Sequence, residues 1–363
     1  MRYVVSIKSG LYTFFQTSGG LFWSQYLGDG LWSNATSIFN GKIEYFKVSL
    51  CKGRVLIVYQ TSQAAICVVF NDGEVTETTL VEGGLEGRYH ALPINDTDIF
   101  LVHNMPISRE YSHILMSHII NGDGTWSQSK NIGRVVPFGH GYAFDMLPVR
   151  DNHFLLFYQA QGAGFGADLG FREILGNKIS EFNIVERNAN INGLCHSFLA
   201  TPSGVHMAYM TKGLLAPTLY YIKKDEHGLS QKTTIAQGSN VHSPLIYLKN
   251  GELKLLYMRG NNVFSTALSK SSLAFTQHKE KIGAHQKCRF LHENNINSQY
   301  YANEILMDTT NQRQLKLFDD LVSFEKLVKP YKTKSHNTSI KQAPKVGSQK
   351  DYNNFFDDFG TLI

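Results

Sequence analysis

The sequence predicts an all-β protein: a seven-bladed β-propeller of four-stranded antiparallel blades, followed by a disordered tail with a short C-terminal helix. Two observations lead to this prediction. One short apolar segment recurs along the chain at a nearly constant interval, and each interval contains four short β-like runs separated by turn residues. Helical periodicity is missing before residue 328, which argues against helical repeat arrays.

The repeated segment is a turn followed by an apolar run that ends in an aromatic residue, here called the anchor. It reads GLYTFFQ in its first copy and GRVLIVYQ in its second. The anchors, 44 to 55 residues apart, are Phe15, Tyr59, His103, Tyr158, Tyr209 and Tyr257, with a degraded copy near Tyr301. Blade limits are expected near 1–43, 44–87, 88–138, 139–191, 192–240, 241–284 and 285–328. We expect the ring to close by side-chain packing between the first and last blades.

Turn residues recur before the fourth run of several units, as LGDGLWS (27–33), NDGEVT (71–76), NGDGTWS (121–127) and DEHGLS (225–230). Asp, Asn and Gly tolerate the left-handed backbone that tight hairpins need. The two tryptophan turns resemble degenerate Asp-boxes of the sialidase-like propellers, and the chain is similar in length and blade pattern to uncharacterised bacterial propeller proteins. The sialidase resemblance implies blade architecture only, because the family's R-I-P context does not occur here and no catalytic residue can be carried over.

Composition narrows the function classes. The 363 residues include 23 Phe, 18 Tyr and 3 Trp, which is typical of a well-packed β protein, and the net charge of +5 does not predict a nucleic-acid partner. No run is long and apolar enough for a membrane span, and the start of the chain lacks a signal-peptide pattern. The four scattered cysteines have no zinc spacing. We therefore expect a cytoplasmic protein without a metal or cofactor.

Polar residues stand where the innermost strands of several units begin, as in RYHALP, HGYAFD, CHSFLA, VHSPLI and KCRFLH. Inner strands line the channel of a propeller, so these side chains are expected to meet at its mouth and to bind a glycan or a small anion. The predicted ligand-binding set is Arg88, His90, His140, Asp145, His196, His242 and Arg289. The alternative is that these histidines are structural and hydrogen-bond neighbouring turns.

No catalytic residue is predicted. The carboxylate pairs Asp96/Asp98 and Asp319/Asp320 lie in expected turns, whereas glycosidase chemistry needs two carboxyls across one cleft. The glutamines that follow three anchors, Gln16, Gln60 and Gln159, are expected to join neighbouring blades by amide hydrogen bonds to the backbone.

The tail differs in composition from the rest of the chain. Residues 329–350 are polar and rich in lysine, which predicts a disordered basic linker. In residues 351–363, Asp351 can cap a helix and Gly360 can end it. Four aromatics at helical spacing predict a face that docks a protein partner: Tyr352, Phe355, Phe356 and Phe359.

Two function classes remain open on the sequence. The first is a non-enzymatic scaffold that binds a protein or glycan on one propeller face and docks a partner through its tail. The second is a glycan-active hydrolase or lyase that uses the polar mouth. The sequence favours the scaffold because no complete catalytic set can be assembled from it.

Overall fold

A computed structural model gives the fold. It describes residues 2–51, 53–83, 87–95, 97–107, 112–137, 144–150, 153–162, 167–176, 178–189, 196–211, 216–260, 262–268, 275–278, 285–292, 300–308 and 316–317. Within these ranges the chain is all-β, without an α-helix, and none of its elements is a helix that could cross a membrane. The predicted tail and its helix lie outside the described residues.

Consecutive strands form antiparallel sets, each in sequence order from the inside outward. The first two sets are β1 (Arg2–Ile7), β2 (Gly10–Thr17), β3 (Gly20–Gly28), β4 (Leu31–Trp32) and β5 (Thr36–Asn40), then β6 (Tyr45–Cys51), β7 (Arg54–Gln60), β8 (Ala64–Asn71) and β9 (Glu74–Glu82). The third and fourth are β10 (Tyr89–Pro93), β11 (Ile99–Pro106), β12 (His113–Ile120) and β13 (Lys130–Val135), then β14 (Phe144–Arg150), β15 (His153–Gln161), β16 (Ala167–Leu175), β17 (Lys178–Ile179) and β18 (Asn183–Glu186).

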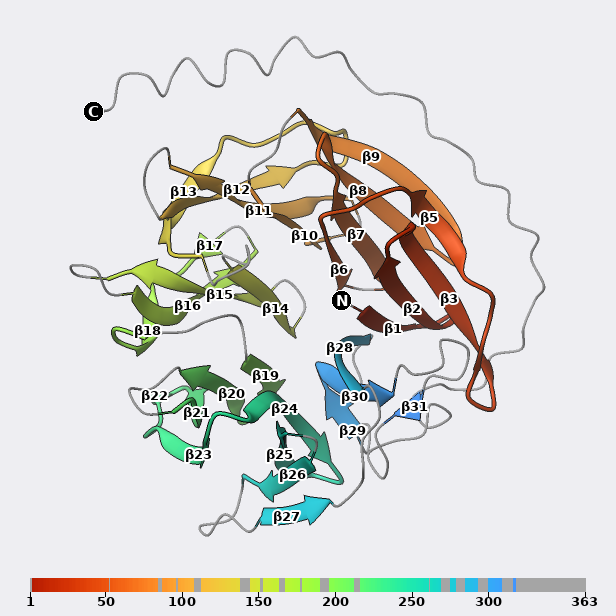
Figure 1. Cartoon of the computed structure of the whole chain (residues 1–363). Coiled ribbons are helices and arrows are strands. Elements are labelled where there is room, and N and C mark those ends of the chain that lie inside the picture. The colour runs from red at the N-terminus through yellow and green to blue at the C-terminus, as the bar shows by residue number, and fades with distance from the viewer. Residues whose placement is uncertain are drawn as a thin grey trace.

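The fifth and sixth sets are β19 (His196–Thr201), β20 (Gly204–Thr211), β21 (Thr218–Asp225), β22 (Gly228–Leu229) and β23 (Thr233–Gln237), then β24 (Val241–Lys249), β25 (Glu252–Arg259), β26 (Asn262–Ala267) and β27 (Phe275–His278). The remaining strands are β28 (His285–His292), β29 (Tyr300–Ala302), β30 (Glu304–Asp308) and β31 (Lys316–Leu317). The sets stand around a ring, with β1, β6, β10, β14, β19, β24 and β28 toward its middle (Figure 1). This is a β-propeller.

The anchors of the sequence repeat occupy equivalent places in the second strand of each set. In five of the six sets, the anchor is directly opposite a residue at or near the start of the inner strand. These pairs are Arg2↔Phe15, Phe46↔Tyr59, Tyr89↔His103, Phe144↔Tyr158 and His196↔Tyr209. The repeat therefore fixes the strand register from unit to unit.

The ring closes by backbone pairing, so the expected closure by side-chain packing is wrong. β28 runs parallel to β1, from Tyr3↔Arg289 to Ser6↔His292, and β30 pairs with the other side of β28. The inner edge of β1 would otherwise present unpaired N–H and C=O groups, which a neighbouring strand satisfies. After His278, β28, β30 and β31 pair antiparallel in that order and join the sheet of β1 through β28, while β29 pairs with β24. The predicted count of seven blades is not confirmed.

Aromatic side chains fill the space between neighbouring sets. Phe70, on β8, is 1% exposed and contacts Tyr12, Phe14 and Trp23 of the first set edge-on, with ring centroids 5.0 to 5.2 Å apart. Such contacts join adjacent sets face to face, and the buried apolar residues of the described part form six clusters, each shared by neighbouring sets.

The turn chemistry agrees with the sequence. Asp29 and Asp72 have positive φ angles of 51° and 49°, each followed by a glycine with positive φ. These are the positions at which Asp and Gly were expected from LGDG and NDG.

The predicted glutamine ties are confirmed. The side-chain amides of Gln16, Gln60 and Gln159 donate to the backbone oxygens of Ile43, Gly87 and Ala189, at 2.8, 2.8 and 2.6 Å. Each acceptor lies in the segment that leads from one set toward the next. The recurrent glutamine thus connects neighbouring sets by a hydrogen bond from its side chain to the backbone.

Replacing Gln159 with alanine should lower the free energy of unfolding by about 1–3 kcal/mol, because the buried carbonyl of Ala189 loses its donor. Urea denaturation measures this. Gln16→Ala is the matched control and should cost less, because its bond is only partly buried. If the two changes lowered the free energy of unfolding equally, burial of the Gln159 hydrogen bond would not account for its contribution.

Candidate functional site

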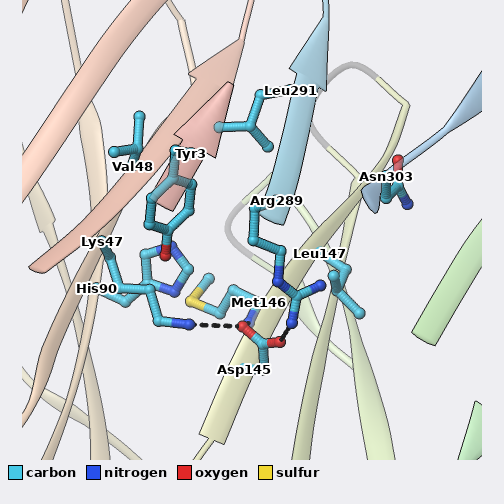
Figure 2. A pocket seen from close by; sticks show the side chains of 10 residues that line it. All are labelled: Tyr3, Lys47, Val48, His90, Asp145, Met146, Leu147, Arg289, Leu291 and Asn303. Carbon is cyan, nitrogen blue, oxygen red and sulfur yellow. Dashed lines mark hydrogen bonds and ion pairs between the residues drawn. The ribbon is translucent and has the colours of Figure 1, made fainter. Parts of the chain in front are cut away.

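One layer of inner-strand residues surrounds the middle of the ring. In each of the first four sets, one inner-strand residue pairs with the anchor, and the next residue along that strand points toward the middle of the ring. It does so because successive side chains on a strand point to opposite faces. These residues are Tyr3, Lys47, His90 and Asp145. Arg289 joins the layer because β28 places it directly opposite Tyr3. Figure 2 shows these five side chains converging from separate strands.

Asp145 is the hub of this layer and is 2% exposed. Its Oδ1 accepts hydrogen bonds from Lys47 Nζ at 3.0 Å and from the backbone N–H of Met146 at 3.1 Å. Its Oδ2 lies 2.9 Å from His196 Nε2 and also accepts from Arg289 Nη2. The carboxylate therefore has four donors, which use all its lone-pair positions.

A second buried carboxylate lies behind Arg289. Glu304, on β30, is fully buried and forms ion pairs with Lys287 at 3.0 Å and Arg289 at 3.1 Å. The Lys287 ammonium also donates to the backbone oxygens of His196 and Pro244, at 2.6 and 2.7 Å. These contacts tie the closing strands β28 and β30 to the fifth and sixth sets.

The protonation states follow from burial and charge. Burial alone would raise the pKa of Asp145, but Arg289, Lys47 and His196 hold that pKa well below its ordinary value. Burial lowers the pKa of His196 to about 4, against the opposing effect of Asp145. Burial, with a contribution from Lys47, lowers the pKa of His90 to about 3. At neutral pH the centre thus holds an ionised Asp145 and neutral imidazoles.

A cavity of about 20 Å³ lies inside the layer. It is lined by Tyr3, Lys47, Val48, His90, Asp145, Met146, Leu147, Arg289, Leu291 and Asn303 (Figure 2). A cavity of this size has room for about one water molecule and none for a sugar ring.

The structure brings together four of the seven predicted ligand residues: His90, Asp145, His196 and Arg289. Arg88 and His242 lie apart from Asp145. Arg88 is near Glu44 at 3.8 Å, with its guanidinium 5.5 Å from the Tyr45 ring. His242 is exposed and contacts its neighbour Ser243 and the backbone oxygen of Gly260.

A bulge separates His242 from the layer. The register of β24 shifts between His242 and Leu245, and Ser243 has a positive φ of 52°, so the side chain is carried outward. His140 lies outside the described residues.

Sequence reasoning missed Lys47, Lys287 and Glu304. Lys47 had a usable signal, because YFKVSL aligns with RYHALP through the anchors Tyr59 and His103, which puts Lys47 level with His90. Lys287 precedes Arg289 by two positions on one strand and so shares its face. Glu304 had no signal, because it lies in the degraded last copy of the repeat.

This arrangement is suited to holding strands together more than to chemistry on a substrate. Every carboxylate oxygen of Asp145 is engaged, and Glu304 is enclosed by two cations. Among the described residues, no group of three or more His, Cys, Asp or Glu side chains is placed to hold a metal ion.

The chain matches no family model, and no curated protein is similar to it in sequence. Among solved structures it is similar to the BP39L lectin from Burkholderia pseudomallei, with a TM-score of 0.50 and 9% identity over 74% of this chain and 80% of that chain. A fungal lectin from Aleuria aurantia, described as a six-bladed β-propeller, has a TM-score of 0.46 and 12% identity over 78% and 96%. A PL25 ulvan lyase has a TM-score of 0.49 and 8% identity over 76% and 80%. The first likeness bears on the fold alone, and the other two are too distant to add to it.

Proposed function

We propose that the protein is a non-enzymatic binding scaffold that recognises a glycan on the propeller face where the inner strands begin. The observation that carries this proposal is the state of the centre: both buried carboxylates are held by cations, whereas two of the predicted ligand residues stand outside these ion pairs, at the rim. The rim residues are Arg88 and His242.

The central carboxylates are poorly suited to acid or base catalysis. A general acid needs a pKa raised toward the working pH, whereas the pKa of Asp145 is held well below its ordinary value. Glu304 is fully buried behind Lys287 and Arg289. Neither carboxylate can reach a glycosidic oxygen without breaking its ion pairs.

The rim residues offer what a ligand needs. Arg88 presents guanidinium donors beside the Glu44 carboxylate, and His242 is exposed with Ser243 next to it. Donors and acceptors of this kind match the hydroxyl groups of a sugar. The rigid centre holds the starts of the strands that carry these groups, so they are positioned before a ligand arrives.

The second part of the proposal is that the C-terminal tail binds a protein partner. Docking through Tyr352, Phe355, Phe356 and Phe359 concerns residues outside the described part and stays a prediction from their spacing.

The test is a glycan array with the full chain, together with a screen of chromogenic glycosides and uronic-acid polymers for turnover. We expect at least one glycan to bind and no substrate to be cleaved. Arg88→Ala and His242→Ala should each weaken binding at least tenfold at an unchanged melting temperature. Lys178→Ala, which replaces an exposed lysine at the start of β17, is the matched control and should bind normally.

Two results would overturn parts of the proposal. Turnover by the unmodified chain that is lost in His196→Gln would assign the mouth to a hydrolase or lyase. Binding that survives both rim changes would remove Arg88 and His242 from the site. The same array with Phe355→Ala/Phe359→Ala should be unchanged, because the tail is proposed to bind a protein and not the glycan.

A further inference from the structure

The small cavity inside the central layer has an unusual balance of donors and acceptors. Its lining includes an ammonium, a guanidinium and a phenol, from Lys47, Arg289 and Tyr3. The one lining carboxylate, Asp145, already accepts from four donors. The amide nitrogen of Asn303 donates to the backbone of Phe198, which leaves its oxygen as an acceptor nearby. The cavity therefore contains many donors and few acceptors.

His90 adds an unsatisfied atom to this lining. The side chain is 3% exposed, its Nε2 lies 3.0 Å from Ser49 Oγ, and its Nδ1 has no hydrogen-bond partner among the described residues. When the Ser49 hydroxyl donates to Nε2, the proton of the neutral ring is on Nδ1. Buried polar groups in native proteins are almost always hydrogen-bonded, so a group without a protein partner points to a bound water molecule or ion.

The formal charge of the lining favours an anion. Lys47 and Arg289 contribute two positive charges and Asp145 one negative charge, and the Lys47 and Asp145 side chains are 4% and 3% exposed. Behind Arg289, Lys287 and Glu304 carry opposite charges and leave this sum unchanged. A bound water must donate two hydrogen bonds as well as accept, and the lining has few acceptors to receive them. A halide only accepts. The volume of about 20 Å³ suits one small particle, such as a water molecule or a monatomic anion.

We propose that the cavity formed by Tyr3, Lys47, His90 and Arg289 binds a single halide ion, with chloride as the physiological occupant. The ion accepts hydrogen bonds from His90 Nδ1–H and the surrounding cationic donors, and it balances the excess positive charge of the layer. It thereby becomes part of the structure that joins the first three sets to β28. This site is separate from the proposed glycan rim, and neither depends on the other.

Two measurements on the full chain test the site. Thermal unfolding is compared at about 150 mM ionic strength in sodium chloride, sodium bromide and sodium gluconate, whose anion is too large for the cavity. Chloride and bromide should raise the melting temperature along a saturable curve, by about 2–4 °C at ten times the dissociation constant. Crystals grown in bromide should show one anomalous peak between His90, Lys47 and Arg289.

His90→Phe should remove the difference between chloride and gluconate, because the ring is kept and the donor is lost. His206→Phe is the matched control, since His206 is also buried but contacts Tyr221 and Thr201, away from the cavity. It should keep the chloride effect whatever its own stability. Equal melting temperatures in chloride and gluconate, or an ordered water without an anomalous peak, would overturn the proposal. If His90→Phe does not fold, the bromide crystal decides alone.

Discussion

Replacing Asp145 with asparagine should lower the free energy of unfolding by about 3–5 kcal/mol, a large share of the total stability of an ordinary domain. The change keeps the shape of the side chain and removes the charge that compensates Lys47, which is 4% exposed, and Arg289. Asparagine keeps one acceptor oxygen and puts an NH2 donor in place of the other, so one of the two pairs of donors around Asp145 then faces a donor. Urea denaturation followed by intrinsic fluorescence measures the loss.

A double-mutant cycle separates the ion pair from general disruption. Asp145→Asn combined with Lys47→Met should cost clearly less than the sum of the two single changes, because the second change removes the ammonium that the first leaves without its carboxylate. Glu226→Gln, in an exposed turn, should leave the unfolding midpoint where it was. Strict additivity of Asp145→Asn and Lys47→Met would contradict a direct interaction between them.

Acidification should destabilise the fold steeply between about pH 6.5 and pH 4. Burial lowers the pKa of His103 to about 3, with His118 adding to the effect, and burial also lowers the pKa of His206 and of His292 to about 4. The pKa values of His90 and His196, at about 3 and 4, are lowered in the same way.

The sign follows from proton binding. Below pH 6.5 the unfolded chain takes up protons on these imidazoles and the folded chain does not, so falling pH favours unfolding until the folded-state pKa is reached. Each such imidazole lowers stability by up to about 1.4 kcal/mol per pH unit in that window. At pH values well above that window they contribute no pH dependence. Asp145 adds its own loss only below the ordinary carboxyl pKa, because its folded-state pKa is depressed.

Melting temperatures from pH 7.5 to 4.5, followed by circular dichroism, measure the effect. His206→Phe should make the pH dependence shallower by one proton, because this buried imidazole is then absent from both states. A melting temperature that is constant from pH 6.5 to 4.5 would show that the folded and unfolded chains take up protons equally, which contradicts lowered pKa values of the buried imidazoles.

The repeat made the architecture predictable, because the anchors determine register and register determines which residues turn inward. Asp145 and His90 were found in this way. His242 was expected beside them and is not, because a local bulge moves it, and bulges leave little trace in a single sequence. Arg88 precedes its strand by one residue and packs at the rim against Tyr45.

The closing of the ring could not be predicted from local pattern. Strand β1 begins at Arg2, whereas its partner β28 begins at His285, and their parallel pairing depends on the whole ring bringing them together. Lys287 and Glu304 derive their roles from that pairing, so they were missed with it.

The parallel pairing of β28 with β1 also orders events during synthesis. The sets from β1 to β27 consist of hairpins between neighbouring segments, which form as soon as the chain leaves the ribosome. The charge on Asp145 has its partner Lys47 early, but Arg289 follows 144 residues later. Until then the inner edge of β1 stays open and the nascent arc has two unpaired ends. Contacts of such sequence separation form slowly, so a nearly complete chain passes through an open stage in which other chains can add to that edge.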